Sequence, residues 1–144
     1  MSSLIKREFD YAIRICAYLT GKKGQGPVSI SQISQKLLIT RPFATKIVYR
    51  LKQYKILNTT QGKEGGVSLN ANPETLSVYD ILEAMGFNSS VNECLKVPGF
   101  CPLEKSCKIH SFFVVQEEKL LQSFKNKMIK DFVILESDFI QEAN

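Results

Sequence analysis

The sequence predicts a mainly α-helical fold with one small β-hairpin. Apolar residues recur at three- and four-residue spacing over the first third of the chain, which is the pattern of amphipathic helices. Two short runs of strand-forming residues then flank a glycine-rich segment, and a long segment from Ile109 to Asp131 contains neither Gly nor Pro. With 144 residues, of which 44% are hydrophobic, the chain can form a single domain with its own core.

The first predicted helix covers residues 9–20. Cys16 belongs to its apolar face, so we expect this cysteine to act as a small buried hydrophobe rather than as a ligand. A loop that contains lysine and glycine, at residues 21–27, follows the helix. The apolar residues that share one face of the helix are Phe9, Ala12, Ile13, Cys16 and Ala17.

Two further helices are predicted on either side of a tight turn. Ser29 with Gln32 three residues later is a capping-box signal for the start of a short helix. Thr40 is a good N-cap for the next helix, and Pro42 suits its first turn because no intrahelical partner is needed for an N–H group there. This third helix is expected to run to about Tyr54.

The third helix is expected to have one apolar face and one basic face. The inward residues are predicted to be Phe43, Ile47, Leu51 and Tyr54. The net charge of +5 suits a polyanionic partner, although an ordinary solvated helix face is the alternative. The residues expected to contact bases or phosphates in a DNA major groove are Arg41, Pro42, Thr45, Lys46, Tyr49 and Lys52.

A glycine-rich hairpin is predicted after the third helix. Residues 56–60 and 67–70 have the pattern of short strands, and the tip between them permits tight turns because it contains three glycines. The order helix, tight turn, helix and hairpin predicts a winged helix-turn-helix DNA-binding domain over residues 1–87. At the tip, the residues expected to lie against the DNA backbone or minor groove are Gln61, Gly62 and Lys63.

Three of the four cysteines lie in a loop predicted at residues 88–107. Cys94, Cys101 and Cys107 are separated by six and five residues, a spacing that lets one loop direct three sulfurs to a common centre. His110 follows Cys107 by three residues and therefore shares its face if that segment is helical. Soft ligands of this kind bind zinc, copper(I) or an iron–sulfur cluster. Unligated thiols are the remaining alternative.

Several classes of protein are not expected. The sequence lacks a run of about 18 apolar residues and a signal-peptide pattern, so we expect a cytoplasmic protein without a membrane span. Disulfides are rare in that reducing compartment, which favours ligand or redox roles for the clustered thiols. An enzyme is not predicted, because the chain has one histidine, no nucleophile elbow and no phosphate-binding loop.

Residues 108–144 are expected to form a dimerisation helix and a C-terminal tail. A helix of about 20 residues is about 30 Å long, too long to be buried against so small a domain. We therefore expect it to pack against a second copy; a core helix within one chain is the alternative. Phe132 to Leu135 are expected to pack back on the first helix. The apolar stripe of the long helix comprises Phe112, Phe113, Leu120, Leu121, Phe124 and Met128.

This layout resembles the winged helix-turn-helix iron–sulfur transcription regulators of the IscR, NsrR and RirA type over essentially the whole chain. In the N-terminal part of the chain, the resemblance depends on Asp10-Tyr11-Ala12 with Arg14 and on the helix-turn-helix at 30–57. It also depends on the tip glycines and on the three-cysteine loop before a long helix. Two wing positions differ: Gln61 stands where an arginine is common, and Val67 where an aromatic residue is usual.

The resemblance implies a homodimeric repressor that binds partly palindromic double-stranded DNA. It also implies a [2Fe-2S] or [4Fe-4S] cluster on the three cysteines, so that operator affinity would respond to iron, redox state or nitric oxide. His110 corresponds to the fourth ligand of IscR-like members, whereas Asp10 corresponds to the aspartate that NsrR-like members supply from the partner subunit; Glu8 is a further carboxylate nearby. The other interpretation is a zinc-stabilised or iron–sulfur protein-interaction module without specific DNA binding.

Overall fold

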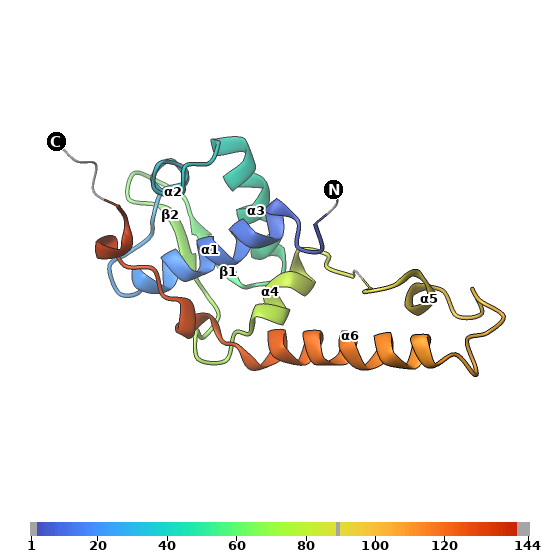
Figure 1. Cartoon of the computed structure of the whole chain (residues 1–144). Helices are drawn as coiled ribbons and strands as arrows, with labels where there is room; N and C mark the ends of the chain where they lie inside the picture. The colour runs from blue at the N-terminus through green and yellow to red at the C-terminus, as the bar shows by residue number, and fades with distance from the viewer. Residues whose placement is uncertain (1–2, 89, 141–144) are drawn as a thin grey trace.

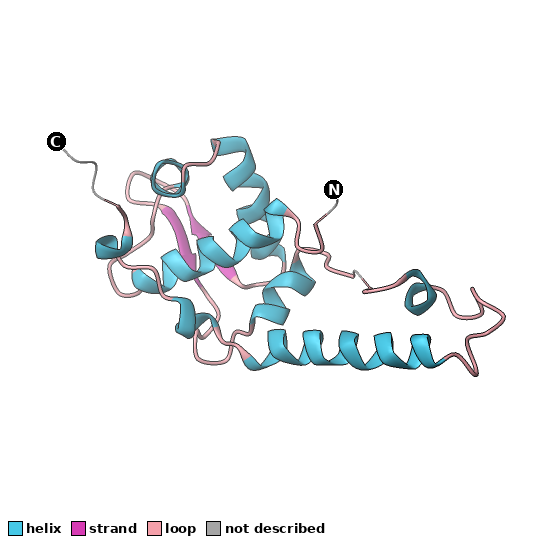
Figure 2. Cartoon of the chain, in the orientation of Figure 1, coloured by secondary structure: helices cyan, strands magenta, loops and turns pink. Residues whose placement is uncertain are grey.

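The chain folds into a rounded head from which a long arm projects (Figure 1). The computed structural model describes residues 3–88 and 90–140. We call residues 3–88 with 127–140 the head, and residues 90–126 the arm. Helices make up most of the regular structure, and one hairpin lies within the head (Figure 2). The elements are α1 (Arg7–Gly21), α2 (Ile30–Leu37), α3 (Arg41–Gln53), β1 (Leu57–Thr60), β2 (Gly66–Leu69), α4 (Val78–Ala84), α5 (Glu93–Lys96), α6 (Lys108–Asn126), η1 (Ile129–Phe132) and η2 (Glu136–Asp138).

The core of the head surrounds α1, which packs against α3, α4 and the hairpin. Ile47 and Leu51 of α3 are fully buried there, as are Ile81 and Leu82 of α4. Full burial of a side chain of this size contributes about 1.5–3 kcal/mol. Cys16 is fully buried, so the expectation that it is a small buried hydrophobe is confirmed. Burial raises the pKa of its thiol to about 12. The buried residues of α1 are Phe9, Ala12, Ile15, Cys16, Ala17, Tyr18 and Leu19.

The turn between α2 and α3 follows the predicted capping residues. The Ser29 hydroxyl accepts a hydrogen bond from the backbone N–H of Gln32 at 3.1 Å, which opens α2. The Thr40 hydroxyl accepts one from the N–H of Phe43 at 3.3 Å and opens α3. Between them α2 ends at Leu38, whose φ of 54° and ψ of 48° are left-handed.

The hairpin is an antiparallel pair that is fastened to the loop before α2. Its register pairs Leu57 with Leu69 and Thr60 with Gly66. Val28 and Val67 exchange backbone hydrogen bonds of 2.8 and 2.7 Å. At Gly66 a Cβ atom would lie 2.6 Å from the Val28 carbonyl oxygen, so this close approach requires glycine. The winged helix-turn-helix fold predicted from the sequence is confirmed.

The arm joins the head through the end of α6. Phe124 of α6 lies edge-on to Phe87, with ring centroids 6.1 Å apart, and Phe87 lies edge-on to Phe9 of α1 at 6.0 Å. The expected helix of about 20 residues is confirmed, since α6 has 19 residues and ends at Asn126. Met128, which was placed in its apolar stripe, lies beyond the helix. Beyond that point the backbone pairs with the α4 entry instead: the Lys127 carbonyl accepts from Val78 N–H at 2.9 Å.

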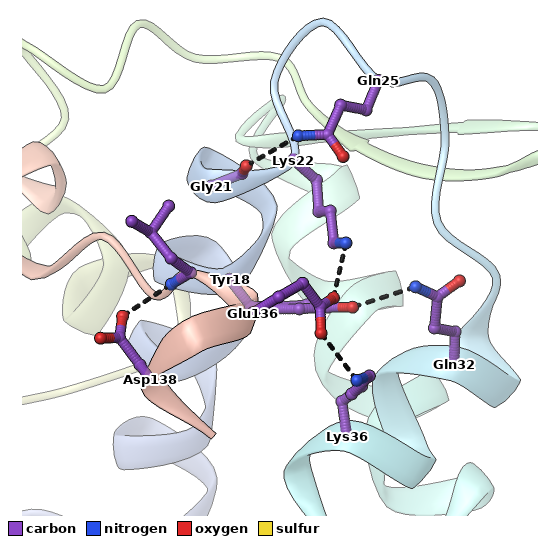
Figure 3. A network of polar contacts seen from close by, with 9 residues as sticks. Tyr18, Gly21, Lys22, Gln25, Gln32, Lys36, Glu136 and Asp138 are labelled. Atoms are coloured by element: carbon purple, nitrogen blue, oxygen red, sulfur yellow. Dashed lines mark hydrogen bonds and ion pairs between the residues drawn. The ribbon is translucent and has the colours of Figure 1, made fainter. Parts of the chain in front are cut away.

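The last described residues fasten the chain end to α1 and α2; we call residues 134–139 the C-terminal clasp. The N–H of Ile134 donates to the Ala17 carbonyl at 3.2 Å. In Figure 3 the Glu136 carboxylate lies between Lys22 and Lys36, with N–O distances of 2.6 and 2.7 Å. The hydrogen bonds from Lys22 and Lys36 lower the pKa of Glu136 to about 2, and the bond that Lys22 donates to Glu136 raises the pKa of Lys22.

Two expectations, for Tyr54 and for the cysteine loop, need correction, and the expectation about membrane spans can be compared with the helices. Tyr54 is 53% exposed rather than inward, because α3 ends at Gln53 and Lys55 takes a left-handed φ of 59°. The cysteine loop, expected to lack regular structure, contains the short helix α5, which Asn92 caps through the N–H of Cys94. Within residues 3–88 and 90–140, none of the helices has the length and apolar character needed to cross a membrane.

Candidate nucleic-acid interface and cysteine site

The recognition helix α3 presents a polar face to solvent. Its opposite face packs against the core through four buried residues, Ala44, Ile47, Val48 and Leu51. The residues predicted to contact DNA are all exposed, and they combine positive charge with hydroxyl groups: Arg41, Pro42, Thr45, Lys46, Tyr49 and Lys52. This arrangement can offer cations to phosphates and hydrogen-bond donors to base edges.

A cation of this face is paired within the chain. The Lys46 ammonium lies 3.0 Å from a Glu8 carboxylate oxygen, and the Lys46 side chain remains 71% exposed. Asp10, two residues further along α1, pairs with Arg14 at 2.9 Å. Both carboxylates that were considered as metal ligands are therefore engaged with cations of their own chain, and the Glu8–Lys46 pair was not expected from the sequence.

The wing tip lies beside the start of α2. Gln61, Gly62 and Lys63 are exposed, and Gly62 has a φ of 104° that favours glycine. Together with Ser29 and Gln32, Lys63 lines an open cleft of about 400 Å³ between the wing and α2. A cleft of this kind, with a lysine and a helix N-terminus at its edges, can accept a phosphate of a DNA backbone.

The cysteine site is formed where α5 meets the start of α6. Cys107 is the N-cap of α6, and its sulfur accepts from the backbone N–H of His110 at 3.4 Å. The Nδ1 atom of His110 lies 3.4 Å from the sulfur of Cys94 on α5. All three side chains are half-buried. Cys94 and Cys107, two of the predicted ligands, therefore each have a sulfur 3.4 Å from a nitrogen of His110.

Cys101 lies in the turn-rich stretch between α5 and α6, where its carbonyl accepts from the N–H of Glu104 at 3.1 Å. Among the residues that the structure describes, no three His, Cys, Asp or Glu side chains are close enough together to hold a metal ion. Two thiols and an imidazole are nevertheless the donors that zinc and iron–sulfur clusters accept. The chemistry of these donors therefore fits such a group. For Cys101 to be a further ligand, its sulfur must move towards Cys94 and Cys107.

The arm leaves apolar surface uncovered. Ile109, Phe112 and Val115 of α6 are 66%, 56% and 44% exposed. Where α6 meets the head, a groove of about 560 Å³ runs between α1, the end of α6 and η1. We call it the interhelix groove; its lining includes Asp10, Ile13, Arg14, Ala17, Phe124 and Ile134. Of the apolar stripe predicted for the long helix, only Phe112 is exposed, whereas Leu121 and Phe124 pack against the core of the head. The sequence gave no signal for the groove.

Comparisons with known proteins agree with this architecture. The sequence model of the Rrf2 family, described as an iron-dependent transcriptional regulator, matches residues 5–134. The HTH-type transcriptional regulator NsrR of Shouchella clausii is 24% identical over 130 residues, which span 90% of this chain and 87% of that protein.

Two solved structures share the fold. CymR (YrzC), the global cysteine regulator of B. subtilis, superposes with a TM-score of 0.76 at 20% identity and covers 91% of this chain and 95% of its own. IscR of T. potens gives a TM-score of 0.68 at 17% identity, with coverage of 88% and 83%. From the extent of the family match, the chain belongs to the Rrf2 family of winged-helix, DNA-binding transcriptional regulators.

Proposed function

We propose that the protein is a homodimeric repressor whose affinity for operator DNA depends on an iron–sulfur cluster held by Cys94, Cys101 and Cys107. Membership of a family described as iron-dependent regulators supports the general role. The observation that carries the finer proposal is the approach of Cys94 to His110 and of His110 to Cys107 at the base of α6. Thiolates and imidazole at one helix start are suited to a soft metal group.

DNA contacts are assigned to α3 and the wing. Arg41, Lys46 and Lys52 would bind phosphates or guanine edges, and the hydroxyls of Thr45 and Tyr49 would add shorter-range contacts. Pro42 would set the first turn of α3, and the wing tip would follow the backbone or minor groove through Gln61, Gly62 and Lys63. Because phosphate contacts dominate affinity, binding should weaken steeply as salt rises.

A second copy of the chain is the proposed occupant of the exposed α6 surface. Ile109, Phe112 and Val115 would leave water on association, and the partner's arm would continue into the interhelix groove. Two copies related by a twofold axis would place their α3 helices about one turn of DNA apart, which matches a partly palindromic operator. In this proposal residues 1–87 read DNA, residues 88–107 hold the cluster and residues 108–144 include the dimer helix.

The fourth ligand is assigned to His110, with Asp10 of the partner subunit as the rival. His110 already contacts the Cys94 sulfur, whereas Asp10 lines the groove that the partner's arm would enter. Glu8 is the weaker candidate because it pairs with Lys46 at the DNA face. A cluster of either the [2Fe-2S] or the [4Fe-4S] type would supply iron–thiolate bonds that join the loop to α6.

The residues of this chain connect that site to the DNA-reading helix. Cys107 fixes the loop to the first turn of α6, and Phe124 at the other end of α6 contacts the head through Phe87. A change in how the loop holds α6 would therefore alter the spacing of the two heads. Such a change in spacing would change operator affinity, because both half-sites must be contacted together.

The test is anaerobic purification followed by absorption spectroscopy and by iron, sulfide and zinc analysis. We expect coloured protein with iron and sulfide, and an operator affinity that changes when the group is removed by a chelator. Colourless, zinc-loaded protein would contradict the cluster assignment. Equal affinity of loaded and stripped protein would contradict the regulatory role.

A further inference from the structure

Leu38 has a backbone conformation that costs free energy for a residue with a side chain. It lies between α2 and α3 with φ 54° and ψ 48°, a left-handed conformation in which Cβ crowds the following carbonyl. Helices that end this way usually have glycine or asparagine at the left-handed position. Lys55, at the end of α3, is the other residue with a side chain that has a positive φ in the described part of the chain.

The fold gains no compensating burial from the Leu38 side chain. It is 86% exposed, whereas the next residue, Ile39, is 7% exposed and fills the turn. Ser34 stabilises the same turn by donating its hydroxyl hydrogen to the Ile39 carbonyl at 2.5 Å. Glycine at position 38 would satisfy this geometry with less strain and without placing an aliphatic group in water.

The position of Leu38 indicates what its side chain contacts. It lies two residues before Thr40, the N-cap of α3. In helix-turn-helix proteins the N-terminal end of the recognition helix is the end that contacts base edges. Arg41 and Pro42, which follow, are both exposed. The exposed Leu38 side chain therefore lies beside the end of α3 that the proposed function assigns to base contacts.

We propose that Leu38 is a specificity-determining residue that contacts apolar groups of the operator, either thymine 5-methyl groups or deoxyribose. Apolar side chains read the thymine methyl in major grooves, and sugars present apolar edges to residues beside the backbone. The backbone strain at Leu38 is consistent with a residue retained for function. This inference rests on the proposed assignment of the α3 face to DNA.

The test compares wild-type protein with the Leu38→Gly variant, both full-length and cofactor-loaded. The duplex is the sequence that wild-type protein selects from a random pool. We expect the variant to bind it at least about fivefold more weakly, the loss typical of one base contact. Its thermal midpoint is expected to rise, because the strain is relieved. Unchanged affinity of Leu38→Gly would overturn the inference.

Replacing single thymines of the selected duplex by uracil identifies the contacted group. If Leu38 contacts a 5-methyl group, wild-type protein loses affinity at one or more positions where Leu38→Gly shows no loss. If it contacts deoxyribose, both proteins respond alike to uracil while the variant stays weaker throughout. Lys55→Gly is the matched control: it removes a left-handed side chain at the far end of α3, and its uracil response should equal that of wild type.

Arg41→Ala separates this inference from the proposed function. If Arg41→Ala weakens binding and Leu38→Gly does not, only the role of Leu38 is contradicted. If neither variant weakens binding, or if wild-type protein selects no duplex, the assignment of the α3 face to DNA fails and the Leu38 inference fails with it.

Discussion

α1 in the head and α6 in the arm are both long amphipathic helices, but their surroundings differ completely. Seven of the 15 residues of α1 are buried, whereas none of the 19 residues of α6 is. The head supplies its own core around α1. The arm has apolar side chains but too little of its own chain to cover them. Similar helical periodicity is therefore found in an interior helix in one region and in an exposed helix in the other. Periodicity alone does not tell what covers the apolar face of a helix.

Replacing a cysteine of the arm should have the largest effect and should leave the head intact. We expect Cys107→Ser to lose essentially all cluster absorbance and iron, because it removes a proposed thiolate ligand while its hydroxyl can still cap α6. The thermal midpoint of the head should change little. The measurement is an absorption spectrum with iron analysis, beside a thermal scan of metal-stripped protein.

Cys16→Ala is the matched control for that experiment. It removes a thiol buried in the head and leaves a small cavity there. The variant should therefore have a lower thermal midpoint and keep the cluster absorbance. The comparison of head and arm breaks down if Cys107→Ser protein still binds a full complement of iron, or if Cys16→Ala loses it.

Charging the exposed surface of α6 should separate the two copies of the proposed dimer. Phe112 is 56% exposed within one chain, and we expect Phe112→Asp to raise the dimer dissociation constant by at least about 100-fold through lost apolar burial. Sedimentation equilibrium measures it. Glu118→Lys, about 120° around the same helix, is the control and should stay dimeric. A Phe112→Asp protein as dimeric as wild type would mean that another surface joins the copies.

A cavity in the head should cost more stability than the same loss in the arm. Ile47 is fully buried, so Ile47→Ala should lower the free energy of unfolding by about 2–5 kcal/mol. Leu103→Ala, at a side chain that is 62% exposed in the arm, should change it by less than about 0.5 kcal/mol. Denaturant titration measures both, and equal losses would show that the arm has a core of its own.

The smallest effect is expected at the C-terminal clasp. The pKa of Glu136 falls from its ordinary value of 4.5 to about 2, so its contribution to stability is present above about pH 4.5 and is lost as pH falls towards 2. Because these charges are solvent-exposed, we expect Glu136→Gln to lower the thermal midpoint by a few degrees at most.

The gap between wild type and Glu136→Gln should therefore be widest at neutral pH and should close in acid. Glu74→Gln, at another exposed carboxylate of the head, is the control and should track wild type. A gap as wide at pH 2.5 as at neutral pH would show that the clasp depends on packing rather than on charge.

Much of the head could be predicted from the sequence because its signals are local. Ser29 and Thr40 cap the helices that they were expected to cap, and the tip glycines gave the position of the wing. In the arm, the approach of His110 to Cys107 follows from their three-residue spacing at the start of a helix. Each of these features depends on residues a few positions apart, where backbone geometry limits the outcome.

The return of residues 132–135 to α1 was predicted and is observed, but other features that depend on distant segments could not be predicted. α6 ends at Asn126 because the next carbonyl pairs with Val78 N–H, and no helix-stop residue marks that position. The clasp joins Lys22 to Glu136 across almost the whole chain, which no periodicity indicates. Whether Cys101 completes the ligand set is likewise a question of loop conformation rather than of residue type.

The burial of Cys16 gives the protein an internal reporter of its own unfolding. With a pKa of about 12 and a fully buried side chain, this thiol is protonated and shielded at neutral pH, so it should not react with alkylating or oxidising reagents. The other three thiols lie in the arm and are half-buried. Metal-stripped, folded chains should therefore label at three sulfurs, and each appearance of a fourth label should count one opening of the head.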